Sequence, residues 1–131
     1  MNSSYVVTPV AAAPEAVVDA IRAELRTRGI TEYVVVDHGH DMAAAGATPH
    51  PAWTLIFGNP AAGEAVLAAE LEAAVDIPLR LAVVGDGDGA SRIVMRPTNT
   101  LLDAELAGPA DKLTGVLVSI AEAARDHAQA G

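Results

Sequence analysis

Short apolar runs and apolar residues at helical spacing follow one another along the first part of the chain. Residues 5–10 form a brief run rich in β-branched side chains, which predicts a first strand. Pro14 suits the first turn of a helix, where its missing N–H would be unpaired anyway, and Gly29 suits the helix end. The run at 33–36 predicts a second strand. The large apolar residues of the helix share one face: Val17, Val18, Ile21 and Leu25.

The middle of the chain predicts a strand and then a helix. Residues 53–57 form the strand, and its large side chains alternate toward one face, which is typical of a core position. Asn59 can cap the next helix and Pro60 can occupy its first position. We expect this helix to run to about Ala74.

The last part of the chain predicts a hairpin and a long helix. Strands at 79–84 and 92–96 flank the turn sequence GDGDGAS. Thr100 can cap a short helix, and the last helix begins at Gly108-Pro109. The apolar residues of the last helix are close to ideal helical spacing: Leu113, Val116, Leu117, Ile120, Ala121 and Ala124.

The predicted order of elements is therefore β-α-β-β-α-β-β-α. Helices interleaved with antiparallel hairpins are typical of the α+β class. We expect one twisted, mainly antiparallel sheet with its helices packed on one face. A length of 131 residues fits a single domain, residues 1–131.

Composition narrows the classes of function. Hydrophobic residues make up 51% of the chain, and the absence of cysteine excludes disulfides, zinc–thiolate sites and cysteine nucleophiles. A net charge of −9 disfavours binding to nucleic-acid phosphates or an anionic membrane surface. No apolar run reaches the ~18 residues of a membrane span, and the first residues lack a secretory pattern. We expect a cytoplasmic protein without a nucleic-acid partner, a membrane or a cofactor.

Histidines and carboxylates follow the second predicted strand, in a polar stretch with room for a turn of helix around 42–45. His38 is a candidate general acid/base, with Asp37 or Asp41 to orient its ring. If the strand continued, His38 and His40 would share a face and, with Asp41, form a candidate metal site. The simpler interpretation, which we favour, is a strand end at which Asp37 caps the following turn.

A glycine-containing turn, Phe57 to Gly63, leads into the helix that Asn59 caps. The free N–H groups and the positive dipole of a helix N-terminus attract anions and carbonyl groups. Phe57, Gly58 and Asn59 are therefore candidate ligand-binding residues. Capping by itself accounts for every residue of the turn, so these residues alone favour a structural role.

Arginines gather on the predicted hairpin of this acidic chain. Arg80, Arg92 and Arg96 would together bind a carboxylate or a phosphate. Solvated positions or salt bridges are the more common role for surface arginines. Sequence does not fix the register of the hairpin, so whether the three share a face stays open. The turn at 85–90 matches a G-x-G-x-x-A dinucleotide fingerprint, but a strand follows it, which excludes that function.

Several segments in chain order resemble the domain of unknown function 302 family of prokaryotes, over residues 5–128 or so. Two of them, taken together, are specific: FGNP-x-x-G at 57–63 and DIPL at 76–79. The others are Asp37-His38, AAAG at 43–46 and DGDG at 86–89.

The resemblance implies a compact α+β domain, commonly a homodimer, without an established activity. It directs attention to the positions that match the family's motif: His38, Phe57, Gly58, Asn59, Pro60 and Gly63. Family members typically carry an aromatic residue and a Tyr-Asn-like segment after DGDG. Here that stretch is RIVMRPTN, so a ligand contact from that tyrosine would be lost or replaced, with Arg96 as the candidate replacement. His40 is not expected of the family.

We prefer the hypothesis of a small homodimeric module that binds a small molecule or a partner and performs no chemistry. The high apolar fraction favours the dimer, because an interface would bury the surplus. If the second and third strands pair, His38 and Asn59 could line one cleft. The first alternative is an enzyme that uses His38 as general acid/base in a cleft next to the 57–63 turn. The second is a metal-binding protein that uses His38, His40 and Asp41.

Overall fold

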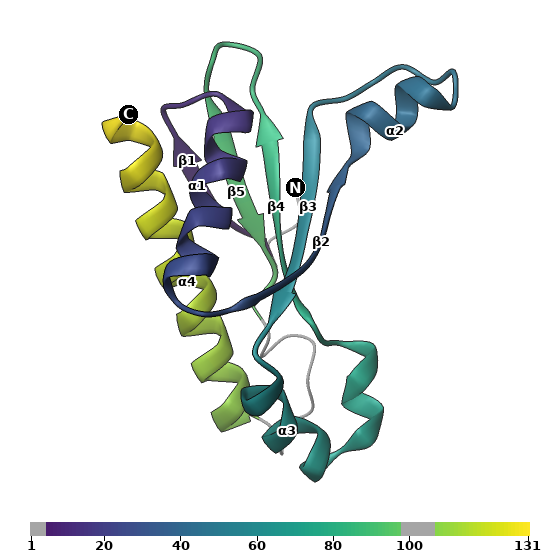
Figure 1. The fold of residues 1–131 in the computed structure, drawn as a ribbon, viewed down its shortest axis with the longest axis vertical. Helices are drawn as coiled ribbons and strands as arrows, with labels where there is room; N and C mark the ends of the chain where they lie inside the picture. Colours follow the sequence, from purple (N-terminus) through teal and green to yellow (C-terminus); the bar gives the residue numbers. More distant parts are fainter. Residues whose placement is uncertain (1–4, 98–106) are drawn as a thin grey trace.

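A computed structural model describes residues 5–97 and 107–131 (Figure 1). The strands are β1 (Val6–Val10), β2 (Thr31–Asp37), β3 (Ala52–Gly58), β4 (Leu79–Gly85) and β5 (Ser91–Met95). The helices are α1 (Pro14–Thr27), α2 (His38–Ala44), α3 (Pro60–Ala69), the 3₁₀ helix η1 (Leu71–Val75) and α4 (Ala107–Ala130). The short helix predicted after Thr100 lies outside the described residues.

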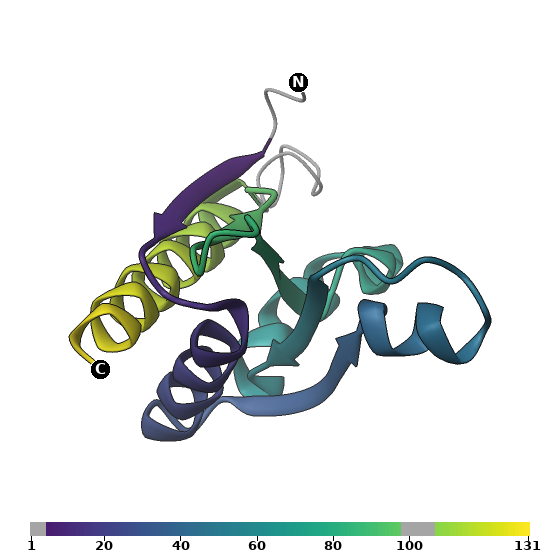
Figure 2. The same ribbon diagram turned by 90° about the horizontal axis from the view of Figure 1, so that it is seen from above.

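The five strands form one antiparallel sheet in the order β1-β5-β4-β3-β2. From β2 to β5 each strand pairs with the next one along the chain, whereas β1 joins the sheet at the free edge of β5. Helices α1 and α4 lie side by side, and the sheet curves around them (Figure 2). The predicted α+β class, with a mainly antiparallel sheet, is confirmed.

The core lies between the sheet and these two helices. Alternate strand residues face it, as the alternation at 53–57 predicted: Leu55 and Phe57 of β3 and Leu81 and Val83 of β4 are completely buried, and Trp53 and Leu79 are partly buried. The predicted stripe of α1 is buried, whereas in that of α4 Leu113 is partly buried and Val116 is 37% exposed. The largest buried side chains come from the sheet and from both helices: Phe57, Leu55, Leu81, Ile93, Ile21, Leu25, Leu117 and Ile120. Within residues 5–97 and 107–131, no helix has the length and apolarity required to cross a membrane.

Two element boundaries differ from the predictions. Helix α2 begins at His38, earlier than the turn predicted at 42–45, because the Asp37 carboxylate accepts a hydrogen bond from the His40 backbone N–H at 2.9 Å and caps it. The helix predicted to reach Ala74 ends at Ala69, and Glu70 is extended. Its alanine-rich sequence has helix propensity throughout, but packing decides the end: η1 turns back and buries Ala73 against Val66.

Candidate functional site

The Phe57–Gly63 turn lies where β3 leads into α3. The Asn59 side-chain oxygen accepts hydrogen bonds from the backbone N–H groups of Ala61 and Ala62, at 3.0 and 3.4 Å. Pro60 occupies the first helical position, so the predicted cap is confirmed. Gly58 lies against the Tyr33 ring, since a Cβ there would be 3.4 Å from Cε2 of Tyr33.

A cleft of about 880 Å³ opens beside this turn, at the end of the molecule where α3 and η1 lie (Figure 1). Its walls are mainly apolar and come from β3, α3, η1, the segment before β4, and α4. Arg28 reaches the cleft but is engaged, since its guanidinium donates to the Glu24 carboxylate at 2.7 Å and to the Ser119 hydroxyl at 2.8 Å. The main apolar residues of the cleft are Leu67, Leu71, Ile77, Leu113 and Val116.

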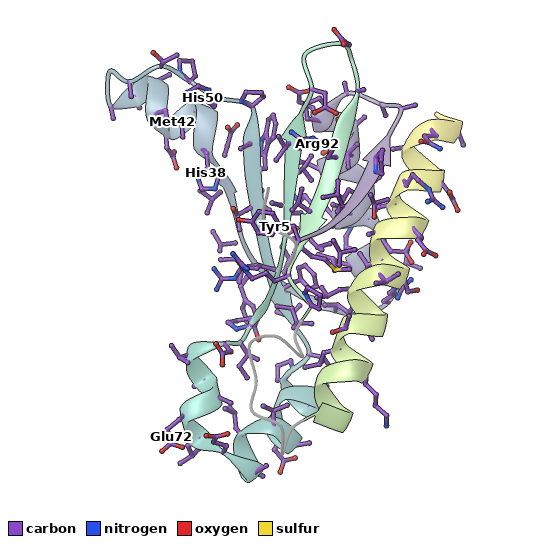
Figure 3. All side chains as sticks on the ribbon, turned by 180° about the vertical axis from the view of Figure 1, so that it is seen from behind. Tyr5, His38, Met42, His50, Glu72 and Arg92 are labelled. Carbon is purple, nitrogen blue, oxygen red and sulfur yellow. The ribbon has the colours of Figure 1, made fainter. Side chains whose placement is uncertain are left out.

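His38 lies at the other end of the sheet from this cleft. Strands β2 and β3 run antiparallel, with Asp37 opposite Trp53 and Thr31 opposite Gly58. Residues that follow the two strands therefore emerge about 20 Å apart, the length of such strands. Figure 3 shows His38 beside α2 and Glu72 of η1 at opposite ends of the molecule. The predictions of one cleft for His38 and Asn59, and of a general acid/base next to the 57–63 turn, are therefore wrong.

The surroundings of His38 support a structural role for this histidine. Its Nε2 and the Thr54 hydroxyl oxygen form a 2.7 Å hydrogen bond that ties the start of α2 to β3. The Asp37 carboxylate, one of the two predicted orienting groups, is the helix cap instead.

The predicted metal site is not assembled. The strand does not continue past Asp37, and on a helix the side chains of His38 and His40 point about 200° apart instead of sharing a face. In the described part of the chain, no group of three or more histidines and carboxylates could hold a metal ion.

The hairpin register places Arg80 and Arg92 on one face of the sheet. Arg92 is opposite Val84, and Val94 is opposite Ala82. By strand alternation, Arg80 points to the same side as these residues, away from α1 and α4, and Arg96 directly follows the end of β5. All three arginines line a hollow of about 460 Å³.

The three arginines differ in their partners. The Arg92 guanidinium forms a 2.7 Å ion pair with Asp86, and that of Arg96 lies 4.8 Å from the centre of the Tyr5 ring (Figure 3 labels Arg92 and Tyr5). Arg80 makes no ion pair with any residue that the structure describes. The predicted arginine cluster thus lies on one surface, although the sequence could not decide this.

Comparison with protein families gives a match over nearly the whole chain. The model of a domain of unknown function, DUF302, matches residues 6–127. The chain belongs to the DUF302 family. Its fold resembles the crystal structure of an uncharacterized conserved DUF302 protein from Bacillus stearothermophilus, with a TM-score of 0.77, 16% sequence identity, and coverage of 97% of this chain and 99% of that one. No curated protein matches the sequence.

The cleft of this DUF302 domain contains residues that the sequence analysis did not single out. Phe57, Gly58 and Asn59 were predicted as ligand-binding residues, and all three line it. The rest of the lining comes from elements that are distant in sequence, such as Tyr33 on β2 and Leu113 on α4. No local pattern joins these residues. The exposed position of Val116 and the partly buried position of Leu113 in the predicted stripe of α4 become visible only in the fold.

Proposed function

We propose that this DUF302 domain is a binding module that takes a small apolar molecule in the cleft beside the Phe57–Gly63 turn. The observation that carries the proposal is the cleft itself, about 880 Å³ and lined mainly by apolar side chains. Ligand sites of soluble proteins typically have about 300–1,000 Å³ and apolar walls with few polar groups. Two polar groups of the lining are already engaged, Asn59 by the helix cap and Arg28 by Glu24 and Ser119.

Gly63 offers the sharpest test, because it borders the cleft from a regular helical position. Among the described residues, a Cβ at this position would meet Cδ1 of Ile77, at the ordinary contact distance of 3.9 Å. We expect Gly63→Leu to fold and to occupy part of the cleft next to Ile77. Binding of the neutral dye N-phenyl-1-naphthylamine, followed by its fluorescence, should be saturable in the natural protein and weakened about tenfold or more by the substitution, a loss of about 1.4 kcal/mol.

The matched control is Gly63→Ala, which adds one methyl group and leaves most of the cleft open. It should keep the dye affinity of the natural protein and fold at least as well, since alanine is the better helix former. A natural protein that shows no saturable binding, or a Gly63→Leu variant that binds the dye as well as Gly63→Ala does, would contradict a ligand site in this cleft.

We also propose that the module is a homodimer and that η1 contributes to the interface. Leu71 and Val75, both on η1, are 74% and 82% exposed, although both are large and apolar. Large apolar side chains that lie together on a surface are typical of interaction sites. Sedimentation equilibrium at micromolar concentration should give twice the chain mass of 13.3 kDa. Val75→Glu should shift the mass toward the monomer.

Ala43→Glu is the control for the dimer experiment, because it adds the same charge at an exposed position of α2. It should leave the dimer intact. A natural protein of monomeric mass would argue against the dimer, and a Val75→Glu variant that stays dimeric would exclude η1 from its interface.

A further inference from the structure

The apolar cleft and the arginine-lined hollow adjoin one another. Pro78 and Leu79 line both of them. Arg80 is the next residue along β4, and its side chain points to the uncovered face because Leu79 and Leu81 point the other way. A cation therefore lies directly beyond the place where the cleft meets the uncovered face.

The charge at this place is unusual for the chain. Arginine and lysine total 8 against 17 acidic residues, yet three of the arginines line this one hollow. Among the residues that the structure describes, one carboxylate, that of Asp76, also lines it, and Asp86 pairs with Arg92 from the hairpin turn. In this part of the chain the three arginines outnumber the two acids, which favours an anionic group in the hollow.

Arg80 is the arginine best placed to bind such a group. It is exposed, and within residues 5–97 and 107–131 it has no ion pair to break. A guanidinium fits a carboxylate with two parallel hydrogen bonds, a geometry that a lysine does not offer. Its neighbours on the same face, Ala82 and Val94, are apolar and only partly exposed, so neither carries a charge that would compete for the guanidinium.

We propose that the ligand of this module is an amphipathic carboxylate, whose apolar body occupies the cleft and whose carboxylate binds Arg80. This inference rests on the proposed function and names the chemical class of its ligand. A carboxylate at Arg80 keeps its charge at the surface, whereas the apolar body leaves water, so each part of the molecule meets a matching environment.

Decanoate and decanol test this assignment, because they share an apolar chain and differ in the head group. Each is used to displace N-phenyl-1-naphthylamine from the natural protein, Arg80→Gln and Arg26→Gln at pH 7.5. We expect Arg80→Gln to weaken decanoate about tenfold and to leave decanol unchanged. Arg26→Gln, which removes the same charge from the end of α1, should change neither. Gly63→Leu should weaken both compounds.

The outcomes separate the two proposals. If decanol and decanoate both displace the dye but Arg80→Gln leaves the decanoate affinity unchanged, the carboxylate assignment is wrong and the apolar cleft stands. If Arg26→Gln weakens decanoate as much as Arg80→Gln does, the effect is one of overall charge and the assignment to Arg80 is again wrong. If no compound binds the natural protein, the ligand-binding function itself fails.

Discussion

Replacing Phe57 by alanine is expected to lower the free energy of unfolding by about 3–5 kcal/mol. The ring is completely buried in the main core, on the strand that leads into the Phe57–Gly63 turn. Its removal takes away apolar contacts and leaves a cavity that the surrounding strands can fill only in part. Urea unfolding followed by circular dichroism, at a fixed protein concentration, measures the change.

Ile56→Ala is the matched control for this substitution. Ile56 precedes Phe57 on β3 and points to the uncovered face, where it is only partly buried. Ile56→Ala removes about half as many side-chain carbons as Phe57→Ala and leaves no enclosed cavity, so we expect a loss of stability well below half of that at Phe57. Equal losses of stability at the two positions would contradict the difference in burial between the two faces of β3.

Replacing Ile120 by alanine is expected to lower the free energy of unfolding by about 2–5 kcal/mol. Ile120 is completely buried on α4 and belongs to the same core as Ile21 and Leu25 of α1. These two helices cover one face of the sheet, so a cavity between them weakens the packing of both helices against the sheet. The same urea unfolding experiment measures the change in the free energy of unfolding.

Val116→Ala is the control on the same helix, one turn earlier. Val116 is 37% exposed, so the truncation removes little buried surface and should cost less than about 1 kcal/mol. A larger loss of stability at position 116 than at position 120 would contradict the described orientation of α4 against the sheet.

Much of the fold was predictable because its signals are local. The buried faces of α1 and α4 follow from residue spacing, and the caps at Asp37 and Asn59 follow from side-chain oxygens placed before a helix. The family match rests on local motifs as well. A protein with 16% identity has the same fold, which shows that few specific residues are needed to maintain this pattern.

The candidate site was less predictable because it depends on how strands pair. Spacing along the chain does not show that β2 and β3 are antiparallel neighbours, which sends His38 and Asn59 to opposite ends of the sheet. The end of α3 at Ala69 also depends on tertiary packing, since Ala73 must turn back against Val66 to be buried. The turn from α3 into η1 forms one wall of the cleft, and no residue pattern before Ala69 predicts that the helix ends there.

The place of β1 in the sheet determines when this strand can pair during synthesis. Its partner is β5, and Val10 meets Ser91, which is 91 − 10 = 81 positions later. At about 5–20 residues per second, the ribosome needs roughly 4–16 seconds to make that stretch. The strands β2, β3, β4 and β5 each meet a neighbour as soon as it emerges. For that interval the nascent chain presents the apolar side chains of an unpaired first strand, and its edge is closed only when the hairpin has been completed.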